Sequence, residues 1–237
     1  MTNRKMIMTN LVFLPVSLAL HQRFLQIQQQ FQQGSTEKLS QPLGLMLADL
    51  SAEVLGRMFV DLLAKAKMQV STVEEKTTLA ESEKVVQQVI ETFKKYMPYA
   101  VSFFSNDRLQ PLVDYLIGNF VQGDQQAYLT FPIETDLVED FYEQSNILMQ
   151  QTESREAIID GFNDVIALID AGVEHLILEP KQRLKFNFVI DKTLQGVLNL
   201  TTTVGYKRLE KLAQQVKQPI ALLYVTHFIA FFSAKMD

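Results

Sequence analysis

The chain contains no cysteine and no tryptophan, and it has only three histidines among 237 residues. Without cysteine it can form no disulfide, no thiolate-bound zinc site, no iron–sulfur cluster and no covalent cysteine intermediate. Three histidines, His21, His175 and His227, are too few to indicate a histidine-rich metal centre. The residues that remain for chemistry are therefore mainly carboxylates, lysines and arginines.

Glycine and proline are also scarce, with 9 and 7 residues respectively. Most prolines stand where a helix can begin or end, and apolar residues recur every three or four positions along most of the chain. This pattern predicts an all-α fold, a single-domain bundle of about eight or nine helices with no significant sheet. We find no convincing internal repeat and no linker dividing residues 1–237, so one helical domain is expected.

Two segments illustrate how the helices are predicted. Residues 43–66 carry apolar side chains on one face, which indicates a helix between Pro42 and Val70. Thr78 and Glu81 have the spacing of a capping box and predict a following helix over about 79–97. Residues 128–132 have some strand character, but five residues without an evident partner are expected to form a loop.

The sequence lacks the motifs of several common enzyme classes. It has no phosphate-binding or dinucleotide-binding glycine loop, no nucleophile elbow and no His-Glu-x-x-His zinc motif. The residues three positions before the histidines are not glutamates, which excludes a ferritin-like di-iron centre. We therefore expect no cofactor and no recognisable catalytic centre.

Positive charge is not in excess either, with 22 Lys and Arg against 27 Asp and Glu and a net charge of −5. Such a chain has no general attraction for nucleic-acid phosphates. The one short basic stretch, residues 206–211, contains Glu210. No nucleic-acid partner is predicted.

Acidic residues gather in a predicted helical hairpin over about 135–179. Two Asp-x-x-x-Asp pairs, Asp136/Asp140 and Asp160/Asp164, could hold Mg²⁺ if they faced one another. At about 100° per residue, however, both pairs point away from the apolar faces of their helices. A solvated acidic surface is favoured, and a metal-dependent all-α hydrolase or transferase using helices 136–164 is kept as the alternative.

The region over 181–234 is first basic and then apolar. Residues 181–217 contain eight basic and two acidic side chains, a net charge of +6, and residues 219–234 predict a final helix that is apolar nearly all round. That helix is too short to cross a bilayer and fits a buried core helix, or one in contact with a membrane surface. The candidate ligand or membrane contacts are Lys207, Arg208, Lys211, Lys217 and His227. His227 also fits a hydrogen-bonded core histidine.

The other end of the chain has an apolar run over 11–20 that follows Arg4 and Lys5. It resembles a weak secretory signal, but Asn10 and Pro15 interrupt it. A cytoplasmic location is the expectation, with export as the weaker alternative. Processing of residues 1–20 stays open.

Phenylalanine and methionine are abundant, with 16 and 9 residues. Such side chains line adaptable apolar cavities, although a core without Trp or Cys also needs them to fill its volume. We expect a non-enzymatic helical binding protein that takes a partner protein or an apolar, lipid-like ligand, with peripheral membrane contact and homo-oligomerisation left open.

Overall fold

The computed structural model describes residues 9–150, 154–184 and 188–233. The elements of the first half are β1 (Thr9–Val16), α1 (Leu18–Gln32), α2 (Ser40–Leu55), η1 (Gly56–Val60), α3 (Asp61–Gln69), α4 (Val73–Ser102), α5 (Asn106–Gly118) and β2 (Phe120–Gln122). Those of the second half are β3 (Ala127–Glu134), α6 (Thr135–Gln150), α7 (Arg155–Val173), η2 (Glu174–Leu178), α8 (Glu179–Leu184), α9 (Phe188–Asn199), η3 (Leu200–Gly205), α10 (Tyr206–Gln215) and α11 (Gln218–Ile229). The segments η1, η2 and η3 are π-helical turns.

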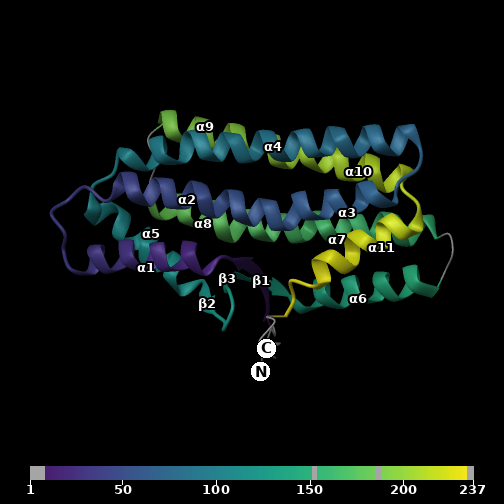
Figure 1. Ribbon diagram of the computed structural model, residues 1–237, viewed down its shortest axis with the longest axis horizontal. Coiled ribbons are helices and arrows are strands. Elements are labelled where there is room, and N and C mark those ends of the chain that lie inside the picture. Colours follow the sequence, from purple (N-terminus) through teal and green to yellow (C-terminus); the bar gives the residue numbers. More distant parts are fainter. Residues whose placement is uncertain (1–8, 151–153, 185–187, 234–237) are drawn as a thin grey trace, which may run out of the picture.

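Each π segment joins the two α-helices beside it into one continuous rod, so the described residues form eight helical rods. Four of them are long and run along the long axis of the molecule: α2–η1–α3, α4, α7–η2–α8 and α9–η3–α10 (Figure 1). The shorter α1, α5, α6 and α11 lie around a small sheet at one side. The predicted all-α bundle is confirmed.

The helix α4 begins earlier and ends later than the sequence pattern predicted. Its N-terminal cap is Thr72, whose hydroxyl accepts a hydrogen bond from the Glu75 backbone N–H, while the Glu75 carboxylate accepts one from the Thr72 N–H. Thr78 lies inside the helix and donates its hydroxyl to the Glu74 carbonyl. The helix also continues through Pro98. The capping box that begins the helix is therefore Thr72/Glu75, six residues before the predicted one.

The bundle also contains a small sheet, and the loop predicted over residues 128–132 was wrong. β3, which includes residues 128–132 predicted as a loop, is the central strand of a three-stranded antiparallel sheet in the order β1-β3-β2. Its long partner β1 contains most of the signal-like run, and Val12 and Leu14 there are fully buried. The two strands are separated by more than a hundred residues, so no local pattern could reveal their pairing.

The two halves of the chain repeat one structural unit, which the sequence analysis missed. Each half runs strand, short helix, π-interrupted long helix, long helix, short helix. β1 begins at residue 9 and β3 at 127, while η1 begins at 56 and η2 at 174, and both differences are 118. At this offset, five buried positions of α2 match five buried positions of α7: Ser40, Leu43, Gly44, Leu47 and Leu50 correspond to Ile158, Gly161, Phe162, Val165 and Leu168.

The sheet reveals how the two halves are related in space. Val12 pairs with Phe131, and Phe13 pairs with Thr130. At the offset of 118, Phe131 is the counterpart of Phe13, and Thr130 is the counterpart of Val12. Each strand therefore pairs with its own counterpart, as a two-fold axis through the β1–β3 pair requires. In Figure 1, α1 with α5 and α6 with α11 accordingly lie on opposite sides of the sheet.

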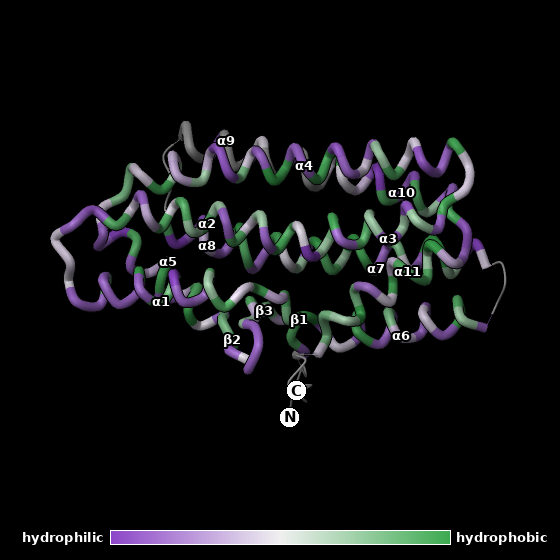
Figure 2. Tube along the Cα trace, viewed as in Figure 1, coloured by the Kyte–Doolittle hydropathy of each residue, from purple (hydrophilic) through white to green (hydrophobic). Residues whose placement is uncertain are grey.

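The last helix, α11, belongs to the core. It packs against α3, α6 and α7, and it buries Tyr224, Val225 and Phe228 among others. The predicted helix over 219–234 ends at Ile229, because residues 230–233 turn back so that the Phe231 carbonyl accepts a hydrogen bond from the Phe13 N–H of β1. Along the other helices, hydrophobic and hydrophilic residues alternate within each turn (Figure 2). Within the described ranges, no helix is long and apolar enough to cross a membrane.

Candidate ligand-binding cavity

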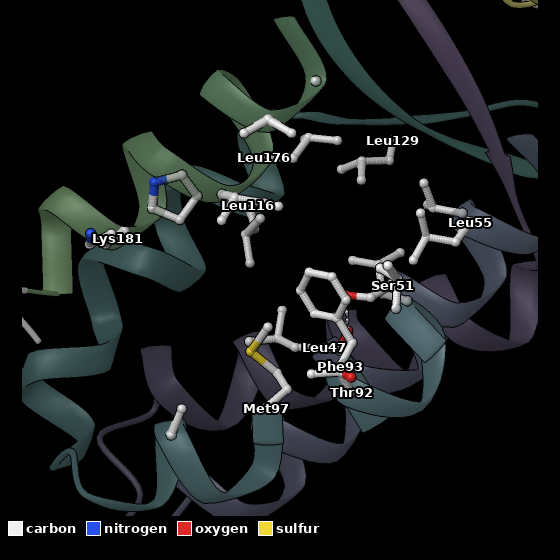
Figure 3. Close-up of a pocket in the computed structure, with 18 of the residues that line it drawn as sticks. Leu47, Ser51, Leu55, Thr92, Phe93, Met97, Leu116, Leu129, Leu176 and Lys181 are labelled. Atoms are coloured by element: carbon white, nitrogen blue, oxygen red, sulfur yellow. Dashed lines mark hydrogen bonds between the residues drawn. The ribbon is translucent and has the colours of Figure 1, made fainter. Parts of the chain in front are cut away.

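An apolar cavity of about 210 Å³ lies between the two halves. One wall comes from α2, η1 and α4, and the opposite wall comes from α5, β3, α7, η2 and α8. Figure 3 shows Phe93 and Met97 of α4 on one side of the hollow and Leu116 and Leu176 on the other. Tyr99 also lines the cavity and is 52% exposed, so the cavity reaches the surface beside α4.

The cavity lies where the structural repeat places equivalent residues on opposite walls. Three positions in the first half line the cavity together with their counterparts 118 residues later. One is the residue before η1 and two lie in η1: Leu55 corresponds to Val173, Met58 to Leu176, and Phe59 to Ile177. The π segments thus border the cavity from both halves. π turns inside α-helices are frequent at functional sites.

Three polar side chains of the lining have partners within the protein. The Ser51 hydroxyl donates to the Leu47 carbonyl at 2.8 Å, and the Thr92 hydroxyl donates to the Gln88 carbonyl at 2.6 Å. Such bonds to the preceding turn leave carbon atoms to face the hollow. Lys181, at one edge of the lining (Figure 3), forms an ion pair with Asp191 at 2.6 Å. The cavity therefore favours an apolar occupant.

A second cavity of about 80 Å³ adjoins the first. The two share Leu55, Phe59, Val89 and Ile169 in their walls, and the smaller one continues between α4 and α10 towards α11. The two cavities thus lie one after the other along α4, the larger one beside residues 89–101 and the smaller one beside residues 82–89.

The polar groups of the smaller cavity are partnered with one exception. Ser82 donates its hydroxyl to the Thr78 carbonyl at 2.9 Å, Tyr206 donates to Asp170, and Arg208 forms an ion pair with Glu81. Tyr224 is 2% exposed, and its hydroxyl has no hydrogen-bond partner among the described residues. Burial raises the pKa of this phenol, so it remains a neutral donor.

Side chains from the opposite half bond to backbone carbonyls of the first two π segments. The imidazole Nε2 of His227, on α11, lies 3.1 Å from the carbonyl oxygens of Arg57 and Met58 in η1. The Tyr115 hydroxyl, on α5, lies 2.8 Å from the His175 carbonyl oxygen in η2. Arg57 and His175 are counterparts at the offset of 118. The two bonds therefore hold the two cavity walls in a similar way.

Of the residues predicted as ligand or membrane contacts, Lys207, Lys211 and Lys217 are exposed, and Arg208 is partly buried beside the smaller cavity. Only Arg208 lines either cavity. His227 lies in the helix packing against η1, where burial and the nearby Lys65 ammonium lower its pKa, so its hydrogen bonds are those of a neutral core histidine. The membrane role of the three lysines stays a prediction.

Of the four residues in the acidic pairs, Asp164 lies differently from the prediction. Asp164 does not point away from the core: it is half-buried, and its Oδ2 has no hydrogen-bond partner. Burial, together with the charges of Asp140 and Asp160, raises its pKa to about 7. The helical-wheel argument considered one buried face of α7, whereas α6, α10 and α11 all pack against it.

Asp136 and Asp140 are exposed on α6. Among the described residues, no group of three or more Asp, Glu or His side chains is placed to hold a metal ion. The structure thus brings three of the four predicted carboxylates near one another without forming a ligand set.

Sequence reasoning missed a second polar cluster, which lies behind the cavity wall. His175 Nδ1 is 2.8 Å from Glu179 Oε1, and the Tyr115 hydroxyl is 2.7 Å from Glu179 Oε2. The bond from Tyr115 is the main reason that the pKa of Glu179 lies below its usual value. None of the three side chains lines either cavity. The i, i+4 spacing of His175 and Glu179 was the available signal.

No protein-family model, curated protein or solved structure matches this chain. The cavity is therefore interpreted from its own geometry.

Proposed function

We propose that this protein binds an elongated apolar ligand, such as a molecule with an alkyl chain, in the cavity between its two halves. The observation that carries the proposal is an apolar space of about 210 Å³, in whose lining the Ser51 and Thr92 hydroxyls and the Lys181 ammonium are already bonded within the protein. Engineered apolar cavities of roughly 150 Å³ stay dry and bind benzene. A larger cavity of the same chemistry gains from burying hydrocarbon.

The position of the cavity supports the same function. Ligand pockets form preferentially at interfaces between structural units, and this one lies between two repeated units. The exposed rings of Tyr96 and Tyr99 line the cavity where it reaches the surface. They offer a route by which a ligand enters without unfolding the bundle.

Filling the cavity tests the proposal. Ala100 of α4 lines it and is partly buried, so Ala100→Leu places additional carbon in the hollow. The fluorescence of N-phenyl-1-naphthylamine reports binding to an apolar site, and decane competes for it. We expect saturable, decane-sensitive binding to the wild-type protein and an affinity at least about tenfold lower for Ala100→Leu.

Ala64→Leu is the matched control, because Ala64 is exposed on α3 and lies outside both cavities. It should bind the dye as the wild-type protein does. Equal affinity in all three proteins, or no saturable binding to the wild-type protein, would overturn the proposal. Native mass spectrometry of the purified protein offers a second readout, since a resident lipid-like ligand adds a discrete mass.

A further inference from the structure

The larger cavity opens beside a group of exposed aromatic side chains near the end of α4. Tyr96, Tyr99 and Phe103 are three of the four exposed aromatic residues in the described part of the chain. Their spacing of three and four residues places them on one side of the helix, and the ring centroids of Tyr99 and Phe103 are 4.7 Å apart. Tyr96 and Tyr99 also line the cavity. We call these three residues the aromatic face.

The charge bordering the aromatic face is positive. Residues 92–103 contain Lys94 and Lys95, both exposed, and no acidic residue. The Lys95 ammonium lies 5.1 Å from the centroid of the Tyr96 ring, which places a cation directly beside the face. Glu91, the last acidic residue before this stretch, points about 140° away from Tyr96 around the helix, at about 100° per residue.

The neighbouring helix α9 adds a further cation. Arg208 of α10 pairs with Glu81, so α10 lies beside the first half of α4 and α9 lies along its second half (Figure 1). Lys192 of α9 is exposed, whereas the carboxylate of Asp191 is paired with Lys181. Exposed aromatic rings and unpaired lysines therefore occur together around the opening of the cavity.

Two other surfaces have only one of these two features. Tyr142 on α6 is 49% exposed, but its exposed neighbours Glu139 and Glu143 are acidic. Lys207 and Lys211 are exposed on α10, where no large apolar side chain is exposed among the described residues. Only the end of α4 combines aromatic rings with positive charge.

We infer that the aromatic face and Lys95 dock on the surface of an anionic lipid bilayer, from which the apolar ligand enters the cavity. Tyrosine and phenylalanine rings are favoured at the boundary between headgroups and acyl chains, and lysines beside them are attracted to anionic lipids. A bilayer also dissolves alkyl molecules that water excludes. The supply of ligand rests on the proposed function, whereas docking on the bilayer can be measured separately.

Flotation with lipid vesicles tests the inference. The wild-type protein should float with vesicles of phosphatidylcholine and phosphatidylglycerol at low salt, and it should bind less at high salt or to phosphatidylcholine alone. The double variant Lys95→Glu/Phe103→Ser reverses one charge and removes one ring of the face. We expect its partition coefficient to be at least about tenfold lower.

A matched double variant makes the same two changes elsewhere on the surface. Lys211→Glu/Tyr142→Ser alters one exposed lysine of α10 and one exposed ring of α6, and it should float as the wild-type protein does. Lys95 and Phe103 line neither cavity, so N-phenyl-1-naphthylamine should bind both double variants normally when vesicles are absent. Circular dichroism checks that both are folded.

The outcomes separate docking from ligand binding. If the wild-type protein does not float with anionic vesicles at low salt, or if the two double variants lose binding equally, the inferred docking face is wrong while the apolar cavity stands. If the protein floats but the dye does not bind, the proposed function fails and the docking face remains. Loss of flotation confined to Lys95→Glu/Phe103→Ser supports the inference.

Discussion

The two halves of this molecule reach the same architecture with different residues. In the first half the carbonyls of η1 accept hydrogen bonds from an imidazole, and in the second half a carbonyl of η2 lies against a phenol. In each case the side chain comes from the short helix at the end of the other half. The repeat therefore preserves burial and the satisfaction of backbone groups, while residue identity is free to vary.

A similar comparison applies to the glycines that allow close helix contact. A Cβ on Gly44 would lie 2.7 Å from the Pro98 Cα, and a Cβ on Gly161 would lie 2.7 Å from the Val225 Cγ2. The first contact is with backbone of α4 and the second is with a side chain of α11. The first half thus has less freedom to adjust than the second.

Substituting these glycines should produce the largest effects. We expect Gly44→Ala to lower the free energy of unfolding by about 2–3 kcal/mol, because the helix backbones must separate. Gly161→Ala should cost only about 1 kcal/mol, since Val225 can change rotamer. Urea unfolding followed by circular dichroism measures both. Equal losses in the two variants would contradict the proposed difference between the halves.

Removing the cross-half hydrogen bonds should have the next largest effect. His227→Phe keeps an aromatic ring but leaves two carbonyls of η1 without this donor, which should cost about 1–3 kcal/mol. Tyr115→Phe removes the hydroxyl beside a single carbonyl of η2 and should cost about 0.5–1.5 kcal/mol. Thermal unfolding at pH 8 compares them, and a larger loss for Tyr115→Phe would contradict the interpretation.

The same two variants, His227→Phe and Tyr115→Phe, should also differ in how their stability depends on pH. The pKa of His227 is lowered in the folded protein, so its contribution to stability is complete above about pH 6.5 and is lost as the pH falls through the lowered value. This loss should be absent in His227→Phe. Tyr115→Phe should keep this loss above about pH 5, where Glu179 is ionised with or without the bond from Tyr115, and it is the control in that range.

Asp164 provides a smaller, pH-dependent difference between the halves. Its counterpart 118 residues earlier is Met46, which is fully buried, so the second half places a carboxylate at a core position. Because the folded pKa is raised from 3.8 to about 7, the stability contributed by the protonated form is present below about pH 4 and is lost as the pH rises to 7.

Asp164→Asn should therefore match the wild-type protein near pH 4 and have a Tm higher by about 2–4 °C at pH 8. Differential scanning calorimetry across this range tests the difference. Asp136→Asn, at an exposed position on α6, is the control and should leave the pH profile unchanged. A lower Tm for Asp164→Asn at pH 8 would show that the carboxylate is stabilising.

The smallest expected effect concerns η1 itself. A Cβ on Gly56 would have nothing within 4 Å, and the residue has helical dihedral angles. Gly56→Ala should therefore stabilise the protein by about 0.5–1 kcal/mol through the lower entropy of its unfolded chain. Although η1 borders the cavity, Gly56 itself lines neither cavity, so dye binding should stay at the wild-type level. Destabilisation by this variant would mean that the π segment needs the freedom of glycine.

The sequence predicted the helices well where burial is local. The apolar faces of α2 and α7 and the hairpin of α6 and α7 follow from periodicity within single segments. It failed for the sheet and for Asp164, because both depend on neighbours far along the chain. The repeat also escaped notice, since among the five matched buried positions only Leu50 and Leu168 are the same residue.

The candidate site, too, could be predicted from the sequence only in part. An excess of Phe and Met indicated that an apolar cavity was compatible with the composition, but a filled core was equally compatible. The position of Tyr224 without a partner has no sequence signal at all, because a hydroxyl on an apolar helix can bond to any neighbour that packing provides.

The sequence by itself determined that the chain is helical, that it lacks thiol chemistry and that its apolar residues suffice for a large core, since these properties follow from composition and short-range spacing. Tertiary structure alone decided that the two halves pair through β1 and β3 and that their long helices leave a cavity between them. The physical reason is that helix periodicity specifies which face is buried, whereas the gaps between buried faces depend on how the helices of both halves pack together.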